Sequence, residues 1–103
     1  MRLQILHVPD CPGAEALGTL LGPLVAAWPD IEVTRQVVTT ADEAGQLGMT
    51  GSPTILADGR DLFPVPGQQP SLSCRLYPGK HGQLGPAPTA GQLREALTPA
   101  VPG

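Results

Sequence analysis

Aromatic side chains are scarce in this chain of 103 residues, where Trp28, Phe63 and Tyr77 are the only three. The core must therefore be built mainly from Leu, Val, Ile and Ala. The hydrophobic content of 41% is sufficient for a globular chain and too high for a disordered one. We expect a single domain over residues 1–103, because a second domain would be too short to bury a core of its own.

Positive charge is also scarce, with six Lys and Arg against nine Asp and Glu, a net charge of −3 and no basic cluster. This balance argues against nucleic acids and anionic membranes as partners. No apolar run reaches the roughly 18 residues that span a bilayer. The apolar stretch at the start of the sequence is too short to be the apolar region of a signal peptide. We therefore expect a cytoplasmic protein.

Cysteine occurs only twice, at Cys11 and Cys74. In a reducing compartment this number does not make a structural disulfide framework, so we expect two free thiols or a transient pair. No set of His, Cys, Asp and Glu has the spacing of a zinc site, and no glycine-rich phosphate loop is present. The sequence predicts neither a resident metal nor another cofactor.

Glycine and proline are abundant, with 13 of each, and they separate short segments of regular apolar pattern. The patterns predict strands at residues 3–8, 31–38, 54–57 and 60–63. Asp58-Gly59 predicts a hairpin between the last two strands. Capping and apolar spacing predict helices at residues 12–28, from Thr39 or Thr40 to about 47, and 90–97.

This order of elements predicts an α/β fold with a four-stranded mixed sheet. We expect right-handed crossovers to join its first three strands. Residues 64–88 form a Pro/Gly-rich insert before the last helix, and residues 99–103 form a tail. An insert of this length without regular structure is uncommon in a compact domain and is often functional when ordered.

Cys11 follows the first strand and a Pro9-Asp10 turn, at the start of the first predicted helix. Unpaired backbone N–H groups and the positive end of the helix dipole stabilise a thiolate there. This position favours a functional thiol over a small buried hydrophobe. Asp10 is either a turn residue or a carboxylate that holds a proton for the chemistry of the thiol.

Two features of the chain resemble the thioredoxin-like fold. One is the cysteine at the head of the first helix, and the other is the segment Leu-Gly-Met-Thr-Gly-Ser-Pro-Thr-Ile at residues 47–55. The second is similar to the family's Gly-x-Pro-Thr segment, and this implies a cis Pro53 that faces Cys11. The resemblance places Pro12, Ser52 and Pro53 on the substrate side. It implies protein or small-molecule thiols and disulfides as partners.

The chain departs from the thioredoxin pattern at Ala14, which stands where Cys-x-x-Cys would have its second cysteine. Dithiol chemistry within the helix is therefore impossible. The sequence predicts either a single-thiol site or a site completed from elsewhere, for which Cys74 is the only other thiol. Arg75, next to Cys74, is a cation that would favour its thiolate.

A second, local resemblance concerns Ser71-Leu72-Ser73-Cys74, followed by Ala-Pro-Thr-Ala at residues 87–90 and Leu93. These residues are similar to the segment of organomercurial (alkylmercury) lyases that carries their second catalytic cysteine. The resemblance implies that Cys74 and Cys11 take the mercury while a carboxyl group transfers a proton. Ala14 replaces the aspartate of that family, and Asp10 or Glu15 would have to substitute for it.

Three functions follow from these observations. The first is thiol–disulfide exchange by Cys11, with Cys74 as the resolving thiol. The second is a soft-metal or organomercurial site formed by the same two cysteines, with Asp10 as proton donor. The third is a non-catalytic thioredoxin-like module that binds a partner through a groove at Pro53 and through the insert.

Overall fold

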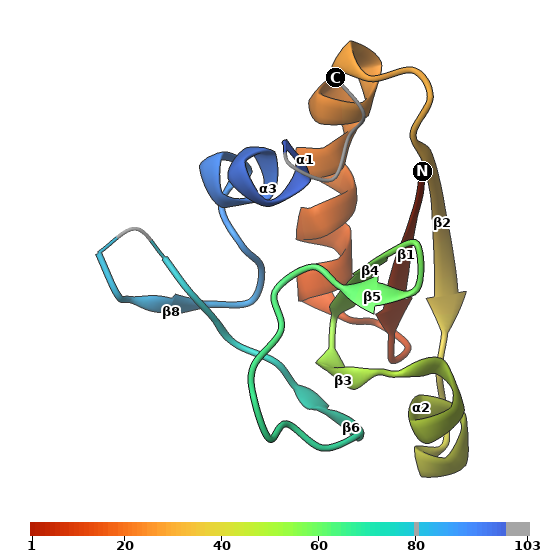
Figure 1. The fold of residues 1–103 in the computed structure, drawn as a ribbon. Coiled ribbons are helices and arrows are strands. Elements are labelled where there is room, and N and C mark those ends of the chain that lie inside the picture. The colour runs from red at the N-terminus through yellow and green to blue at the C-terminus, as the bar shows by residue number, and fades with distance from the viewer. Residues whose placement is uncertain (80, 99–103) are drawn as a thin grey trace.

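A four-stranded mixed sheet is the centre of the computed structural model, which describes residues 1–79 and 81–98 (Figure 1). Its strands lie in the order β2-β1-β4-β5 and are β1 (Arg2–His7), β2 (Glu32–Val37), β4 (Thr54–Ala57) and β5 (Arg60–Asp61). β1 is parallel to β2 and antiparallel to β4, which is antiparallel to β5. The predicted four-stranded mixed sheet of an α/β protein is confirmed.

The expected crossover into the third strand of this sheet is wrong, because β4 runs antiparallel to β1. After α2 (Ala41–Leu47) the chain first forms the short strand β3 (Thr50–Ser52), which lies outside the four-stranded sheet. It then turns at Ser52-Pro53 and enters the sheet from the opposite end. β3 is not among the strands that the sequence predicts.

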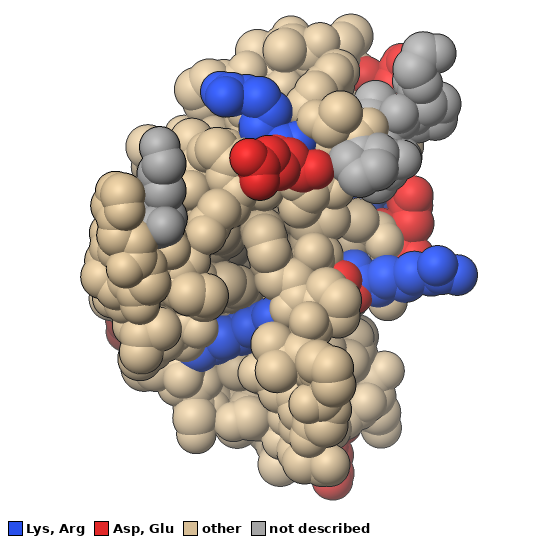
Figure 2. All heavy atoms as spheres, turned by 60° about the vertical axis from the view of Figure 1, so that its left-hand side comes forward, with Lys and Arg blue, Asp and Glu red and all other residues tan. Residues whose placement is uncertain are grey.

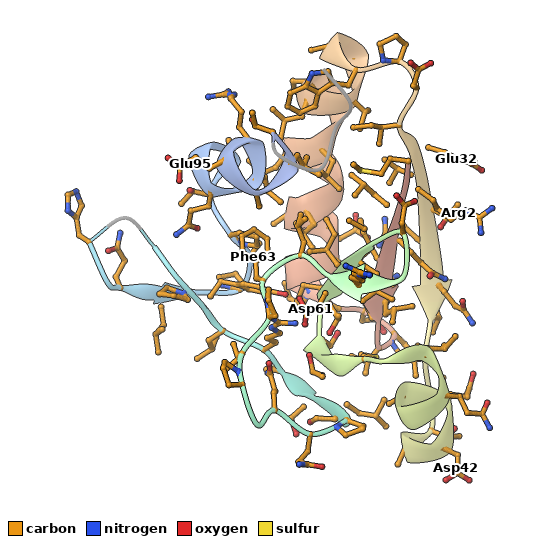
Figure 3. The ribbon with its side chains drawn as sticks, viewed as in Figure 1. Arg2, Glu32, Asp42, Asp61, Phe63 and Glu95 are labelled. Carbon is orange, nitrogen blue, oxygen red and sulfur yellow. The ribbon has the colours of Figure 1, made fainter. Side chains whose placement is uncertain are left out.

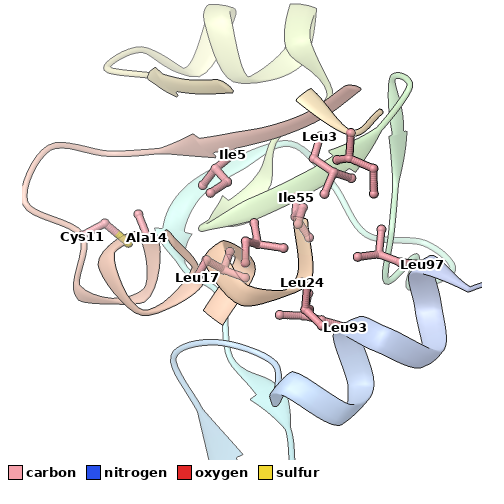
Figure 4. Close-up of a cluster of buried hydrophobic side chains, with 11 residues drawn as sticks. Leu3, Ile5, Cys11, Ala14, Leu17, Leu24, Ile55, Leu93 and Leu97 are labelled. Carbon is pink, nitrogen blue, oxygen red and sulfur yellow. The ribbon is translucent and has the colours of Figure 1, made fainter. Parts of the chain in front are cut away.

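The larger core lies between one face of the sheet and two helices, α1 (Pro12–Ala27) and α3 (Ala90–Leu97) (Figure 4). The apolar stripe of α1 supplies Leu17, Leu21 and Leu24, and α3 supplies Leu93 and Leu97. Burial of one such side chain contributes about 1.5–3 kcal/mol of hydrophobic free energy. Packing of these stripes holds the start of α1, and with it Cys11, in a fixed place on the sheet.

The opposite face of the sheet carries a smaller core around α2, made of Leu6, Val38, Ala44, Met49 and Leu56. Two local signals define α2. The Thr40 hydroxyl accepts a hydrogen bond from the Glu43 N–H, and Gly48 ends the helix with a φ of 83°. That left-handed backbone favours glycine, so the helix stops where the sequence predicted.

The insert at residues 64–88 forms three strands, in contrast to the expected structureless loop. β6 (Ser71–Cys74) pairs with β3 in parallel, and β7 (Tyr77–Pro78) pairs with β8 (Leu84–Gly85) as an antiparallel hairpin. β6 passes beside β3, and the chain then crosses to β8 before it returns to α3 (Figure 1). β6 pairs with β3, which is distant in the sequence, and β7 and β8 are very short. The local sequence pattern therefore does not reveal these three strands.

The insert covers a face of the molecule that carries few charges (Figure 2). Between residues 62 and 93 the only charged side chains are Arg75 and Lys80, and Arg75 is buried. Over residues 1–79 and 81–98, none of the helices has the length and apolar character needed to cross a membrane. The predicted tail at residues 99–103 lies outside the described residues.

Candidate functional site

Cys11 is the N-cap residue of α1, and Pro12 occupies the first position of the helix. The Cys11 carbonyl accepts hydrogen bonds from the N–H groups of Ala14, at 3.1 Å, and Glu15, at 3.4 Å. Cys11 is 8% exposed and its thiol is free. Proline fits the first helical position because no intrahelical acceptor exists there for an N–H group. The sequence thus places a sulfur at the helix N-terminus, almost closed off from solvent.

The hydroxyl of Ser52 contacts this sulfur directly. Ser52 Oγ accepts a hydrogen bond from the Val8 N–H at 3.0 Å and donates one to Cys11 Sγ at 3.0 Å. The Val8 amide can only donate, so the hydroxyl proton is left for the sulfur. The sulfur of Cys11 is thus the acceptor of a hydroxyl hydrogen bond inside the protein. Ser52 therefore links the end of β1 to the candidate nucleophile.

The peptide bond between Ser52 and Pro53 is cis, the geometry that the resemblance to thioredoxin-like proteins implies. Pro53 packs against Gly13, in the first turn of α1. A Cβ atom on Gly13 would lie 2.7 Å from Pro53 Cδ and would also collide with the carbonyl oxygen of Pro86. Only glycine therefore allows the helix start, the cis-proline and the insert to meet beside Cys11.

Cys74 lies on β6 and is exposed, with a free thiol. In the pairing between β3 and β6, Cys74 is the partner of Ser52. Adjacent strands are about 4.8 Å apart, so Ser52 is the direct neighbour of both cysteines. It is hydrogen-bonded to the sulfur of Cys11 and lies opposite Cys74 across the ladder.

Arg75 and Tyr77 attach the insert to the same loop. The Arg75 N–H donates to Ser52 O at 2.9 Å, and the Tyr77 hydroxyl donates to Pro53 O at 2.6 Å. The Arg75 guanidinium carbon lies 4.7 Å from the centre of the Tyr77 ring, in a cation–π contact. Burial raises the pKa of Tyr77 well above its ordinary value, against the opposing effect of the Arg75 charge.

The Arg75 guanidinium is engaged by Asp61, at 2.8 Å between Nη1 and Oδ2, and by the Phe63 carbonyl, at 2.6 Å from Nη2. Asp61 ends β5 and lies between the sheet and the insert (Figure 3). The expectation that Arg75 serves the thiol of Cys74 is thus replaced by a different role. Asp61 neutralises the buried charge of Arg75, and this ion pair joins the insert to the sheet.

The other predicted residues lie at the rim of the site. Pro12 and Asp10 are exposed, and Asp10 has a φ of 57° in the left-handed region. Among the hydrogen bonds of residues 1–79 and 81–98, none joins Asp10 to Cys11. Glu15, the other carboxylate considered, forms a solvent-exposed ion pair with Arg35 at 3.0 Å.

The structure brings together Cys11, Ser52 and Pro53, with Cys74 on the adjacent strand. It adds Gly13, Asp61 and Tyr77, which sequence reasoning did not assign to the site. Within the part of the chain that the structure describes, no group of three or more His, Cys, Asp and Glu side chains could hold a metal ion. Chemically, the arrangement presents one shielded sulfur with a hydroxyl donor and one exposed thiol on a neighbouring strand.

No protein-family model, curated protein or solved structure matches this chain.

Proposed function

We propose that this is a thioredoxin-like thiol protein in which Cys11 carries out thiol–disulfide exchange. The observation that carries the proposal is the 3.0 Å hydrogen bond from Ser52 Oγ to Cys11 Sγ at the N-terminus of α1, beside the cis Ser52-Pro53 bond. The sheet order β2-β1-β4-β5 and the cysteine after β1 also support the likeness to that fold.

In the first step, the thiolate of Cys11 attacks one sulfur of a substrate disulfide. A new S–S bond joins Cys11 to that sulfur, the substrate S–S bond breaks, and the other sulfur leaves as a thiolate. The Ser52 hydroxyl holds the attacking thiolate through its hydrogen bond. The main-chain N–H groups at the helix start add favourable electrostatics for the negative sulfur.

In the second step, the thiolate of Cys74 attacks the Cys11 sulfur of the mixed disulfide. The bound substrate sulfur leaves as a thiolate, and a disulfide between Cys11 and Cys74 remains. The protein has then given two electrons to the substrate. Two molecules of a small cellular thiol return them by reducing the new disulfide and are themselves joined in a disulfide. The pairing of Cys74 with Ser52, which contacts Cys11 Sγ, supports this second step.

The test is mass spectrometry of the reduced protein after brief treatment with a small disulfide. We expect a disulfide between Cys11 and Cys74 in the wild-type protein and a mixed disulfide on Cys11 in Cys74→Ser. The Cys11→Ser variant is expected to lose the intramolecular disulfide. The proposal fails if Cys11 stays unmodified in both proteins, or if Cys74 alone reacts at the rate of an ordinary exposed thiol.

A second candidate function is binding of a soft metal ion or an organomercurial by Cys11 and Cys74. The contact of Ser52 with one cysteine and its pairing with the other favours this candidate. Two thiolates suit Hg²⁺ or Cu⁺ better than harder ions. Titration with mercuric ion should then give a one-to-one complex with thiolate-to-metal absorption, which either Cys11→Ser or Cys74→Ser should remove.

Binding of a partner through a groove at Pro53, as in a non-catalytic module, has less support. Pro53 is fully buried, and the Tyr77 hydroxyl occupies its carbonyl. A partner would have to bind the outer surface of the insert. Partner binding that survives Cys11→Ser would favour such a module over both thiol functions.

A further inference from the structure

Five consecutive main-chain carbonyl groups, from residue 49 to residue 53, each accept a hydrogen bond from within the chain. The donors, in order, are the Ser71 N–H, the Gln68 side-chain amide, the Thr54 hydroxyl, the Arg75 N–H and the Tyr77 hydroxyl. Four of these five donors belong to the insert. The segment that leads to Pro53 is therefore covered along its edge by the chain itself.

The approach of the insert to this edge is close. A Cβ atom on Gly51 would lie 2.7 Å from Arg75 Cβ, and the φ of Gly51 is 125°, which also favours glycine. β6 thus sits against β3 at backbone distance over Thr50–Ser52. An extended polypeptide that adds to a strand edge uses the same main-chain groups. It would have to displace β6 before it could pair with this edge.

The sulfur itself is also poorly accessible to a bulky substrate. Cys11 is 8% exposed. The carbonyl of Pro86, from the far end of the insert, lies against Gly13 in the first turn of α1. The face formed by the insert has few charges to attract a charged polypeptide (Figure 2). These features expose only a small part of the Cys11 side chain and leave none of the main-chain carbonyls from residue 49 to residue 53 free for a peptide to bind.

Building on the proposed function, we infer that the substrate of Cys11 is a low-molecular-weight disulfide, and that the insert excludes extended polypeptide disulfides by occupying the edge of β3. The insert then determines substrate class by filling the place of a bound peptide. Cys74 lies on β6, the strand that occupies the edge of β3. The same element therefore excludes polypeptides and supplies the resolving thiol.

The test compares two mixed disulfides with the same leaving group, thionitrobenzoate. In one it is joined to 2-mercaptoethanol, and in the other to the cysteine of an unstructured peptide. Both react with Cys74→Ser, so that the exposed thiol does not contribute, and release of the leaving group is followed by absorbance. Each rate is divided by the rate of the same compound with a free small thiol. We expect the small compound to react at least about tenfold faster after this correction, because the peptide must displace several hydrogen bonds.

The Gln68→Ala variant tests the role of the insert in this selectivity. Gln68 is exposed, and its side chain donates to Thr50 O at 2.9 Å, so its loss weakens the cover of the edge without opening the core. We expect the peptide rate to rise and the small-molecule rate to stay constant. Gln46→Ala, on the exposed side of α2, is the matched control and should change neither rate. Tyr77→Phe, which removes the donor to Pro53 O, should raise the peptide rate in the same way.

Equal corrected rates for the two compounds would overturn this inference and leave thiol–disulfide exchange by Cys11 intact. An unchanged peptide rate in both Gln68→Ala and Tyr77→Phe would overturn the role given to the insert. The proposed function itself is tested separately by adding Cys11→Ser to the Cys74→Ser protein. If this change leaves the release of thionitrobenzoate unaffected, Cys11 is not the reactive group and the proposed function fails.

Discussion

Arg75 and Asp61 form the better shielded of the two ion pairs in the described residues, with side chains that are 4% and 17% exposed and a distance of 2.8 Å from Nη1 to Oδ2. The other pair, Arg35 with Glu15, has side chains that are 40% and 75% exposed. The shielded pair joins the insert to the end of β5. Each charge in it depends on the other, because an unpaired charge at such a place is costly.

We predict that Asp61→Ala lowers the free energy of unfolding by about 3 kcal/mol, because the buried guanidinium of Arg75 loses its counter-charge. Chemical denaturation followed by circular dichroism measures this change. The matched control is Glu15→Ala, which breaks the exposed pair and should cost less than about 1 kcal/mol. Similar losses in the two variants would mean that Arg75 finds another partner or water, and that the ion pair does not fix the insert.

Removal of the Ser52 hydroxyl should slow the reaction of Cys11. We expect Ser52→Ala to reduce the rate of alkylation by iodoacetamide at neutral pH about three- to tenfold, since the thiolate loses its hydrogen-bond donor. The measurement uses the Cys74→Ser background, so that only one thiol reports. Ser52→Thr keeps the hydroxyl and should retain most of the rate. An alanine variant that remains folded and reacts as fast as the Cys74→Ser protein with Ser52 intact would remove Ser52 from the mechanism.

Gly13→Ala should destabilise the protein by about 1–3 kcal/mol, because the added methyl group meets Pro53 and the carbonyl of Pro86. Gly45→Ala is the control, in the interior of α2 with no atom within 4 Å of the added carbon. Alanine there should stabilise the helix by about 0.5–1 kcal/mol. Thermal unfolding of both variants checks the prediction, which would be contradicted by a stable, fully reactive Gly13→Ala protein.

Stability should fall in alkaline solution through Tyr77. Burial raises its pKa above the ordinary value of 10.0, so the unfolded chain releases the phenol proton at a lower pH than the folded protein does. The contribution of the neutral Tyr77 phenol to stability is complete below pH 10 and is lost as the pH rises further. The free energy of unfolding then falls by up to about 1.4 kcal/mol per pH unit. Unfolding measured across this range should show a shallower decline in Tyr77→Phe.

Tyr77 is the only tyrosine, so an absorbance titration of its phenol reports on this site alone. In the folded protein the phenolate should appear only at a pH above that seen in denaturant. Coincident titration curves for the folded and denatured protein would show that the ring is not held in the site.

Helix limits were predictable because local chemistry sets them. Proline at position 12 starts α1, glycine at position 48 stops α2, and Thr89 forms a capping box with Gln92 at the start of α3. The hairpin at Asp58-Gly59 is also a local signal, and it joins β4 to β5 as predicted. In each case, the residues that decide the structure lie within a few positions of the element that they define.

The strands of the insert were not predictable in this way. β6 exists because Ser71 and Cys74 pair with Thr50 and Ser52, which are distant along the chain. The composition of the insert, rich in Pro, Gly and Gln, points to a loop when only neighbours are considered. Its order therefore comes from tertiary hydrogen bonds, which a single sequence does not display.

The candidate site was only partly predictable, because some of its residues are marked by local sequence and others are brought together only by folding. Cys11 is marked by its place before a helix, and Ser52 and Pro53 by a short motif. Asp61 and Arg75 carry no motif and become significant only when folding buries them together. A lone arginine in a nearly uncharged stretch is the one sign in the sequence that such a charge needs a partner.

The unequal exposure of the two cysteines also makes position 74 a point of attachment. Cys74 stands open on β6 while Cys11 is almost enclosed. A bulky maleimide dye should therefore couple at position 74 first and leave the other sulfur unmodified. A fluorophore can therefore be attached specifically at Cys74, beside the candidate site. Its emission would report any displacement of β6.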